Sequence, residues 1–371
     1  MRIGIDAREL CGRATGVGRY LGGLLHEWAA ARTLAHEFVL YAHEPIALPL
    51  DSRRFATRIV PGPPGTWWEQ IRAPRAAASD RLDVWFAPAY SAPLRMATPI
   101  VVAIHDLSFV AHPEWFRIRE GARRRWLTRK SASKASAVIT ISEFSKGELI
   151  GRLNVPPHKV HVIPPGIDGI KNSELRIKNS RPGPRVLFVG SIFNRRHVGD
   201  LIRAFAPLAR AHPDASLDIV GDNRSYPRED LQRTIVEGGL GRRVRWHEYV
   251  SDAELRDLYA QARAFAFLSE YEGLGLTPLE ALAAGVPPVL LDTAVARESC
   301  GDAAVYVPVG DGPATTRALE AVLFDEAARS RIFAAAPHVL AKYSWPRAAQ
   351  ETLAVLEGAC GAGLSAPPTR A

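Results

Sequence analysis

The stretch Ser269-Glu-Tyr-Glu-Gly-Leu-Gly-Leu-Thr-Pro-Leu-Glu-Ala-Leu-Ala-Ala-Gly285 directly follows a short apolar run, Ala264-Phe-Ala-Phe-Leu268. The apolar run is typical of a buried strand, and the glycine-containing segment after it is typical of a loop. The last part predicts a helix with Thr277 at its N-cap and Pro278 in its first turn. A strand that passes through a loop into a helix is the repeating unit of an α/β protein with a parallel sheet.

Two glutamates mark this stretch, with Glu272 on the loop and Glu280 in the first turn of the predicted helix. Between them, the backbone N–H groups of Leu274, Gly275 and Leu276 can point at one spot beside the positive end of the helix. Such a spot suits an anionic phosphate. Carboxylates beside it can accept hydrogen bonds from sugar hydroxyls. The combination predicts a site for a nucleotide sugar.

The same residues have a purely structural interpretation. Thr277-Pro-Leu-Glu280 matches a capping box, in which the Glu280 side chain would reach back to the cap N–H and need no ligand. Gly273 and Gly275 could serve a tight turn, and Glu272 could be a solvated loop residue. The spacing alone leaves both interpretations open.

The segment from Glu272 to Gly285, followed by Val286-Pro-Pro-Val289, resembles the E-x7-E signature of the retaining GT-B glycosyltransferases of family 4. Further motifs agree with this family in order and spacing from Arg2 to about Val355. The resemblance implies a GT-B fold, with two doubly wound Rossmann-like domains facing a central cleft and a C-terminal helix that crosses back to the first domain.

Composition bounds the class of protein. The chain has 371 residues, enough for two domains, and is 47% hydrophobic and 23% charged. It contains no run of about eighteen apolar residues that would predict a membrane span, and Met1–Asp6 is typical of a strand, not of a signal peptide. Three scattered cysteines, Cys11, Cys300 and Cys360, have no metal-binding or disulfide spacing. We expect a cytoplasmic protein without a metal or cofactor.

Short apolar runs followed by turn residues predict the strands of two parallel sheets. The first series is Ile3–Asp6, Phe38–Tyr41, Val84–Ala87, Ile100–Ile104 and Ala137–Ile141, and the second is Val186–Gly190, Leu217–Val220, Val244–Trp246, Ala264–Leu268, Pro288–Leu291 and Ala304–Val307. Helical patterns such as Tyr20–Ala31 and Gly121–Ala135 lie between them.

These series and the resemblance give the expected domains. Ile-Lys-Asn-Ser occurs at 170–173 and again at 177–180, beside Pro and Gly, which indicates a lengthened linker. Ser344 and Pro346 predict the start of a last helix. We expect an acceptor-side domain over 1–168, a linker over 169–184, a nucleotide-sugar-binding domain over 185–342, a crossover helix over 343–360 and a flexible tail over 361–371.

Arg195 and Arg196 follow the first strand of the second series, where family members commonly have an Arg-Lys pair that holds the donor pyrophosphate. Two guanidiniums can bind a diphosphate and stabilise the charge that builds on a leaving group. The alternative is a pair of solvated arginines. Positive charge is mildly unfavourable at a helix start, so an anionic partner is favoured.

In the first domain, the resemblance assigns Gly16 and Gly18 to a loop that faces the donor and places His105 beside the donor sugar and the acceptor. A flexible turn would explain the glycines, and a lone histidine after a strand is often structural. Ser142 is expected to cap a helix. Trp67 and Trp68 could stack on sugars or lipid headgroups, or pack in the core.

In the second domain, Asn223 follows a strand and could meet phosphate or ribose, while Tyr249 and Val250 are placed near the nucleotide base by resemblance. The net charge of +8 is partly local, because residues 117–134 carry eight basic side chains and one acidic side chain. This segment is either a solvated helix face or a contact for an anionic membrane surface. No nucleic-acid recognition motif supports binding to DNA or RNA.

The resemblance implies a metal-independent, retaining hexosyltransferase that moves a hexose from a GDP- or UDP-linked donor to a glycan or lipid-linked acceptor in bacterial polysaccharide assembly. Glu272 would orient the sugar and Glu280 would bind the ribose. A soluble disaccharide synthase or phosphorylase on the same fold is an alternative, and a non-catalytic carbohydrate- or membrane-binding protein is another. A dinucleotide-dependent oxidoreductase is disfavoured, because no Gly-x-Gly-x-x-Gly fingerprint follows a strand with an acid about twenty residues later.

Overall fold

The structure, a computed structural model, describes residues 1–12, 16–31, 33–48, 50–51, 53–167 and 183–363. The chain forms two compact units. Unit 1 comprises Met1–Gly166 together with Tyr343–Ala371, and unit 2 comprises Ile167–Lys342. The expected linker duplication at 170–180 lies outside the described residues, as does most of the expected tail.

Unit 1 contains a seven-stranded sheet in the order β3-β2-β1-β4-β5-β6-β7, in which all neighbouring strands are parallel. Its first six positions repeat the 3-2-1-4-5-6 order of the Rossmann fold. The strands are β1 (Arg2–Asp6), β2 (Glu37–Ala42), β3 (Phe55–Ile59), β4 (Val84–Ala87), β5 (Ile100–Ala103), β6 (Ala137–Thr140) and β7 (Val160–Val162).

The central strands of unit 1 are buried and almost entirely apolar because both faces of the sheet are covered. Every residue of β4, β5 and β6 is buried, as expected for parallel strands between two helical layers. The helices of unit 1 are α1 (Gly16–Ala30), α2 (Ala73–Ala77), α3 (Ser108–Ala111), α4 (Ile118–Lys134), α5 (Glu143–Leu153) and α14 (Trp345–Gly363), with shorter turns η1 (Arg8–Leu10), η2 (Trp68–Arg72), η3 (Pro113–Trp115) and η4 (Pro157–Lys159).

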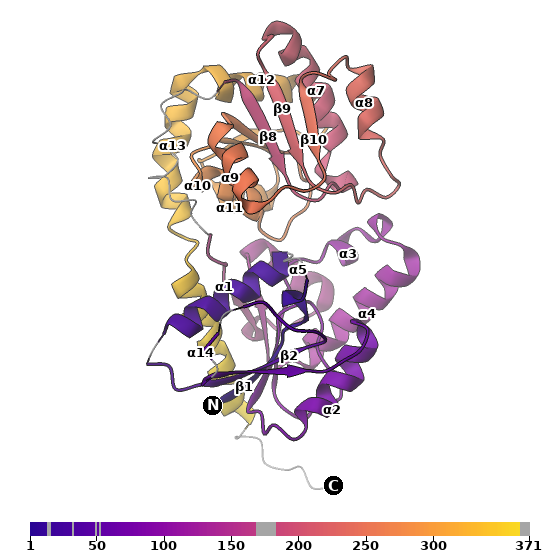
Figure 1. The fold of residues 1–371 in the computed structure, drawn as a ribbon, viewed down its shortest axis with the longest axis vertical. Coiled ribbons are helices and arrows are strands. Elements are labelled where there is room, and N and C mark those ends of the chain that lie inside the picture. Colours follow the sequence, from indigo (N-terminus) through magenta and orange to yellow (C-terminus); the bar gives the residue numbers. More distant parts are fainter. Residues whose placement is uncertain (13–15, 32, 49, 52, 168–182, 364–371) are drawn as a thin grey trace. The chain divides into compact units, whose positions relative to one another are not determined.

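The last helix of the chain completes unit 1. α14 packs against α1 and against β4, β5 and β6 (Figure 1), and the indole of Trp28 donates a 3.0 Å hydrogen bond to the carbonyl of Ala349. A Cβ atom on Gly23 would lie 2.6 Å from the Trp345 ring, so a glycine is needed for this approach. Ser344 Oγ accepts from Arg347 N at 3.5 Å at the start of α14.

Unit 2 contains a six-stranded parallel sheet in the order β10-β9-β8-β11-β12-β13, which is again the Rossmann order. The strands are β8 (Arg185–Val189), β9 (Ser216–Val220), β10 (Val244–His247), β11 (Ala264–Phe267), β12 (Pro288–Leu291) and β13 (Val305–Val307). The helices are η5 (Asn194–Arg196), α7 (Val198–Ala211), α8 (Leu231–Glu237), α9 (Asp252–Gln261), α10 (Leu276–Ala283), α11 (Ala294–Cys300), α12 (Gly312–Phe324) and α13 (Glu326–Leu340).

The strands expected from the apolar runs are confirmed to within two residues at their ends, and Ser142 caps α5 by accepting from Ser145 N at 3.0 Å. Two edge strands were missed. β3 has one buried residue followed by four exposed ones, and β7 has only three residues, so neither gives a clear apolar run. None of the helices in the described part of the chain is both long and apolar enough to cross a lipid bilayer.

Candidate active site

In a doubly wound sheet, ligands bind beyond the carboxyl ends of the strands where the strand order reverses. In unit 2 that point lies between β8 and β11, which are neighbours in the sheet. The chain leaves β8 through Gly190 and Ser191 into η5, and it leaves β11 through Ser269 toward Glu272. Sequence-distant segments therefore meet at the switch point.

The central contact of this site is an ion pair between Arg196 and Glu272. Arg196 Nε donates to Glu272 Oε1 at 2.8 Å, and the two side chains are only 14% and 17% exposed. Ser269 Oγ donates to the same carboxylate oxygen at 2.8 Å. Arg196 also donates to the Ser191 carbonyl at 2.8 Å and lies over the Phe267 ring. Both charged groups are thus held in place before any ligand binds.

The electrostatics keep Glu272 ionised. Burial by itself would raise the pKa of this carboxyl. The positive charges of Arg196 and Arg195 and the hydrogen bonds from Arg196 and Ser269 outweigh burial and hold the pKa below its ordinary value. Glu272 is therefore a hydrogen-bond acceptor at neutral pH, which suits hydroxyl groups.

Glycines at the strand ends leave room for this arrangement. Gly190 has φ of 145°, and a Cβ atom there would lie 2.8 Å from a guanidinium nitrogen of Arg196. Gly221, after β9, has φ of 149°, and its Cβ would lie 2.0 Å from the Gly190 carbonyl oxygen. The positive φ disfavours a side chain at both positions, and at Gly221 the Gly190 backbone leaves no room for one.

His197 and Glu270 belong to the same region and were missed from the sequence. His197 has φ of 47° at the N-cap of α7, and its Nε2 lies 2.5 Å from Glu270 Oε1 while Nδ1 lies 3.0 Å from Asp200 Oδ2. The Glu270 N–H donates to the Arg195 carbonyl at 2.9 Å. These contacts join η5 to the loop after β11. The sequence signal for them was a histidine directly after Arg196 and a third glutamate within the stretch Ser269–Gly285.

Arg195 occupies the same turn as Arg196. Its guanidinium carbon lies 4.3 Å from the centroid of the Phe193 ring, and its charge contributes to the low pKa of Glu272. The structure therefore brings Arg195, Arg196 and Glu272 together in one cluster.

The start of α10 corrects one expectation. Thr277 is not the N-cap, because the helix begins at Leu276 and its N-cap is Gly275, a left-handed residue with φ of 87°. No side chain caps α10, all of whose residues are described, so the capping box between Thr277 and Glu280 does not form. Glu280 is the fifth residue of the helix and not part of its first turn. The left-handed backbone of Gly275 determines where α10 begins, and the capping-box pattern in the sequence does not reveal this conformation.

The loop residues between the two glutamates lie beside Glu272. Leu274 and Gly275 line, with Glu272 and Ser269, a small cavity of about 20 Å³. Leu274 is buried and anchors the loop, while Leu276 opens the helix. The N-terminus of α10 is thus placed next to the carboxylate, as the phosphate hypothesis requires.

The remaining predicted residues of unit 2 lie on loops after β9 and β10. The amide oxygen of Asn223 accepts from the N–H and hydroxyl of Ser225 at 3.1 and 2.6 Å, and its amide nitrogen donates to the Glu229 carbonyl at 2.9 Å. Asn223 therefore shapes its own loop. Tyr249 is 65% exposed after β10, and Val250 is half-buried beside it.

In unit 1, His105 follows β5 and is buried. One ring nitrogen, Nε2, lies 2.8 Å from the Pro88 carbonyl, and the rings of Tyr20 and Tyr90 flank the imidazole. Burial lowers the pKa of His105, and the hydrogen bond to Pro88 and the charge of Asp106 oppose it without reversing it. Asp106 accepts from the Tyr90 hydroxyl at 2.7 Å.

One expectation for unit 1 needs correction, and the alternatives left open for the two tryptophans are resolved. Gly16 and Gly18 are not in a loop, because α1 begins at Gly16 and both glycines lie in its first turn. The two tryptophans do not act as a pair, since Trp67 is 68% exposed whereas Trp68 is buried and donates to the Val60 carbonyl at 2.7 Å. The start of the helical period at Gly16 was obscured because glycine is a poor helix former.

Sequence profiles of two families match the chain. The profile described as "Glycosyl transferases group 1" matches residues 172–339, and the profile described as "Glycosyltransferase Family 4" matches residues 14–169.

Individual proteins agree with these matches. The chain is 26% identical to O-antigen chain mannosyltransferase B of Escherichia coli over 73% of each chain. It is 30% identical to the GDP-mannose:cellobiosyl-diphosphopolyprenol alpha-mannosyltransferase of Xanthomonas oryzae pv. oryzae over 52% of this chain and 50% of that one. HepE of Anabaena, solved with UDP and glucose, has the same fold, with a TM-score of 0.73, 19% identity, and coverage of 96% of this chain and 99% of HepE.

Two Rossmann-like units with this strand order and these relatives define a glycosyltransferase with the GT-B fold. The two profiles follow one another along nearly the whole chain. The protein belongs to glycosyltransferase family 4.

Proposed function

We propose that the protein transfers a hexose, with retention of anomeric configuration and without a metal ion, from a GDP- or UDP-linked donor to a glycan or lipid-linked acceptor in polysaccharide or cell-envelope assembly. The observation that carries this proposal is the ion pair between Arg196 and Glu272 at the switch point of unit 2. It places a cation for phosphate and an ionised acceptor for sugar hydroxyls side by side.

Arg195 and Arg196 are proposed to bind the donor diphosphate together with the N–H groups of Leu274, Gly275 and Leu276. When the diphosphate binds, Arg196 can use its remaining donors, because a guanidinium has five N–H groups and the contacts to Glu272 and Ser191 take only part of them. The phosphate oxygens then lie near cations that are already oriented, which avoids reorganisation as charge builds during the reaction.

Glu272 is proposed to accept hydrogen bonds from the sugar hydroxyls, and Glu280 from the ribose hydroxyls. Tyr249 and Val250 would lie near the base, with Asn223 shaping the loop after β9. In unit 1, Gly16 and Gly18 are proposed to contact the donor, and His105 is proposed to lie beside the donor sugar and the acceptor. A neutral His105, as its lowered pKa indicates, donates its one N–H to the Pro88 carbonyl and leaves Nδ1 as a hydrogen-bond acceptor without adding charge.

In the chemical step, the bond between the anomeric carbon and the donor phosphate oxygen breaks, and its electron pair leaves with the nucleoside diphosphate. The acceptor hydroxyl oxygen forms the new bond to the same face of the sugar, and its proton passes to the departing phosphate oxygen. Arg195 and Arg196 offset the charge on the leaving group. In other enzymes a metal ion can stabilise the charge on a leaving phosphate, and positioned arginine side chains can do the same.

The names of the relatives support the donor class. The Xanthomonas relative is named for GDP-mannose and a cellobiosyl-diphosphopolyprenol, and the E. coli relative for mannosyl transfer to O-antigen chains. HepE was solved with UDP. These names favour a nucleoside diphosphate hexose and leave GDP and UDP as the bases to compare.

Thermal-shift measurements with GDP, UDP, ADP and their hexoses test the donor, since a ligand that binds only the folded state raises the melting temperature with concentration. We expect one base to stabilise the chain and the double variant Arg195→Ala/Arg196→Ala to lose that effect.

NMR of the product with the chosen donor should show the donor's anomeric configuration, and EDTA should leave the rate unchanged. An inverted product, or turnover that is lost in EDTA while the protein remains folded and is restored by a divalent cation, would overturn the corresponding part of the proposal.

A membrane-facing surface on unit 1 is proposed to bring the enzyme to a lipid-linked acceptor. Ile118 and Trp126 of α4 are 86% and 57% exposed, and Arg117, Arg119 and Arg123 are exposed in the same segment. Exposed apolar side chains among cations are typical of segments that lie in an anionic interface. The enzyme should sediment with vesicles that contain anionic lipid but not with purely zwitterionic vesicles. Trp126→Ser should weaken sedimentation with the anionic vesicles. Equal sedimentation with both kinds of vesicle would contradict the proposed membrane contact.

A further inference from the structure

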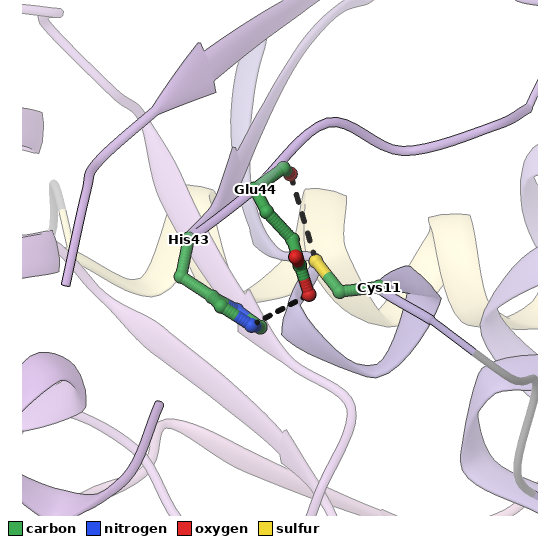
Figure 2. Close-up of side chains that lie close together, drawn as sticks. All are labelled: Cys11, His43 and Glu44. Atoms are coloured by element: carbon green, nitrogen blue, oxygen red, sulfur yellow. Dashed lines mark hydrogen bonds and ion pairs between the residues drawn. The ribbon is translucent and has the colours of Figure 1, made fainter. Parts of the chain in front are cut away.

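A cluster of three potential metal ligands lies in unit 1, outside the residues assigned to donor or acceptor binding. It consists of Cys11, His43 and Glu44, whose thiol sulfur, imidazole nitrogen and carboxylate oxygen all lie within 4.8 Å of one another. Figure 2 shows the three side chains converging, with the Glu44 carboxylate drawn between the thiol and the imidazole.

The sheet brings these residues together. β1 and β2 are parallel neighbours, and the register pairs Asp6 with Tyr41. Cys11 follows η1, just beyond the carboxyl end of β1, while His43 and Glu44 follow the carboxyl end of β2. Because the two strands end at the same sheet edge, ligands more than thirty residues apart in the sequence meet there. No spacing motif could have predicted this site.

The local geometry is close to that of a metal site. His43 Nε2 lies 3.1 Å from Glu44 Oε1, and the Cys11 sulfur lies within 4.8 Å of both other ligand atoms. With Zn–S of about 2.3 Å and Zn–N or Zn–O of about 2.0–2.2 Å, ligand atoms on one tetrahedron are separated by roughly 3.3–3.8 Å. The observed separations, of 3.1 Å and otherwise at most 4.8 Å, bracket that range, so a bound ion requires side-chain rotation.

The environment of each ligand fits the same interpretation. The His43 side chain is only 14% exposed, and its Nδ1 is buried without a hydrogen-bond partner among the described residues. A buried ring nitrogen without a partner is costly, and Nε2 would exchange its 3.1 Å ion pair with Glu44 for a bond to the cation. The Glu44 side chain is 55% exposed, so it can rotate onto an ion arriving from solvent.

We propose that Cys11, His43 and Glu44 bind one zinc ion, with water in the fourth position. A thiolate combined with an imidazole selects zinc over magnesium or calcium, which prefer oxygen ligands alone. The ion would join the segment after η1 to the end of β2. It would stabilise unit 1 and take no part in glycosyl transfer, so the proposed transfer can remain independent of metal.

Cobalt substitution tests the thiolate ligand directly. The full chain, prepared without added histidines and stripped of metal, should bind one equivalent of Co²⁺ and develop a near-ultraviolet thiolate-to-metal absorption band. Zn²⁺ should displace the Co²⁺. Cys11→Ser should abolish the band and His43→Ala should weaken binding at least about tenfold, a loss of the size seen when a metal site is disturbed. Cys360→Ser, which alters another half-buried cysteine, should bind Co²⁺ like the unchanged protein.

Thiol labelling gives a second readout that needs no variant to fold. With a maleimide reagent and mass spectrometry of the digested protein, Zn²⁺ should protect Cys11 several-fold and leave the labelling of Cys360 unchanged. A band that persists in Cys11→Ser, or equal labelling of Cys11 with and without Zn²⁺, would overturn the proposed site.

Discussion

At the scale of single residues, the ion pair of Arg196 and Glu272 makes the site's sharpest prediction. Glu272→Gln keeps the shape and can still accept from Arg196, but it removes the charge that faces the sugar. We expect turnover to fall by about 10²–10³-fold, the loss observed when one preorganised transition-state contact is removed. Steady-state kinetics with the stabilising donor measure this change.

Glu148→Gln is a matched control for that variant. Glu148 is also 17% exposed and paired with an arginine, Arg152, but it lies on α5 of unit 1. Its removal should leave turnover unchanged. If the two variants reduced turnover equally, Glu272 would have no special role.

Glu272 should also make the stability of the fold depend on pH. The folded-state pKa of Glu272 is lowered, so its contribution to stability is present above the pKa of the unfolded chain and is lost as the pH falls through the folded value. Glu272→Gln should therefore narrow the difference in melting temperature between pH 7 and pH 4. An unchanged difference would show that the ion pair contributes nothing to stability.

At the scale of elements, the start of α10 distinguishes the observed helix from the expected one. Because Gly275 is the N-cap, the Thr277 hydroxyl caps nothing, and Thr277→Ala should change the free energy of unfolding by less than about 0.5 kcal/mol. Thr293 accepts from Ala296 N at 3.3 Å and does cap α11. Thr293→Ala should cost about 1 kcal/mol. Urea denaturation measures both changes. If Thr277→Ala lowered the free energy of unfolding more than Thr293→Ala, our assignment of Gly275 as the N-cap of α10 would be wrong.

The elements also show how far sequence reasoning reached. Apolar runs predicted the central strands because buried parallel strands have no polar face, and serine patterns located the caps at Ser142 and Ser344. The edge strands β3 and β7 and the start of α10 were missed. An exposed edge strand has no continuous apolar run. A glycine with a left-handed backbone cannot be distinguished in the sequence from a glycine in an ordinary turn.

At the scale of the whole molecule, unit 1 depends on both ends of the chain. α14 supplies buried residues to the core beneath α1, among them Ala348, Ala349 and Leu356. A fragment of residues 1–166 should therefore expose this apolar face and lose cooperative unfolding. A fragment of residues 183–342 contains the whole sheet of unit 2 and should fold alone.

Calorimetry and nucleotide titration of the two fragments check this prediction. The unit 2 fragment should still bind the donor's nucleoside diphosphate within about tenfold of the full chain, since the proposed cation cluster lies within it. Cooperative melting of the 1–166 fragment at the temperature of the full chain would show that α14 is dispensable.

The sequence by itself determined the α/β class, the two series of strands and the family, because buried strands and a chemically constrained loop leave their pattern in consecutive residues. The tertiary structure alone decided which distant residues meet: Arg196 with Glu272, His197 with Glu270, and Cys11 with His43 and Glu44. Parallel strands carry segments that are far apart in the chain to one edge of a sheet, and no local pattern records which strands become neighbours.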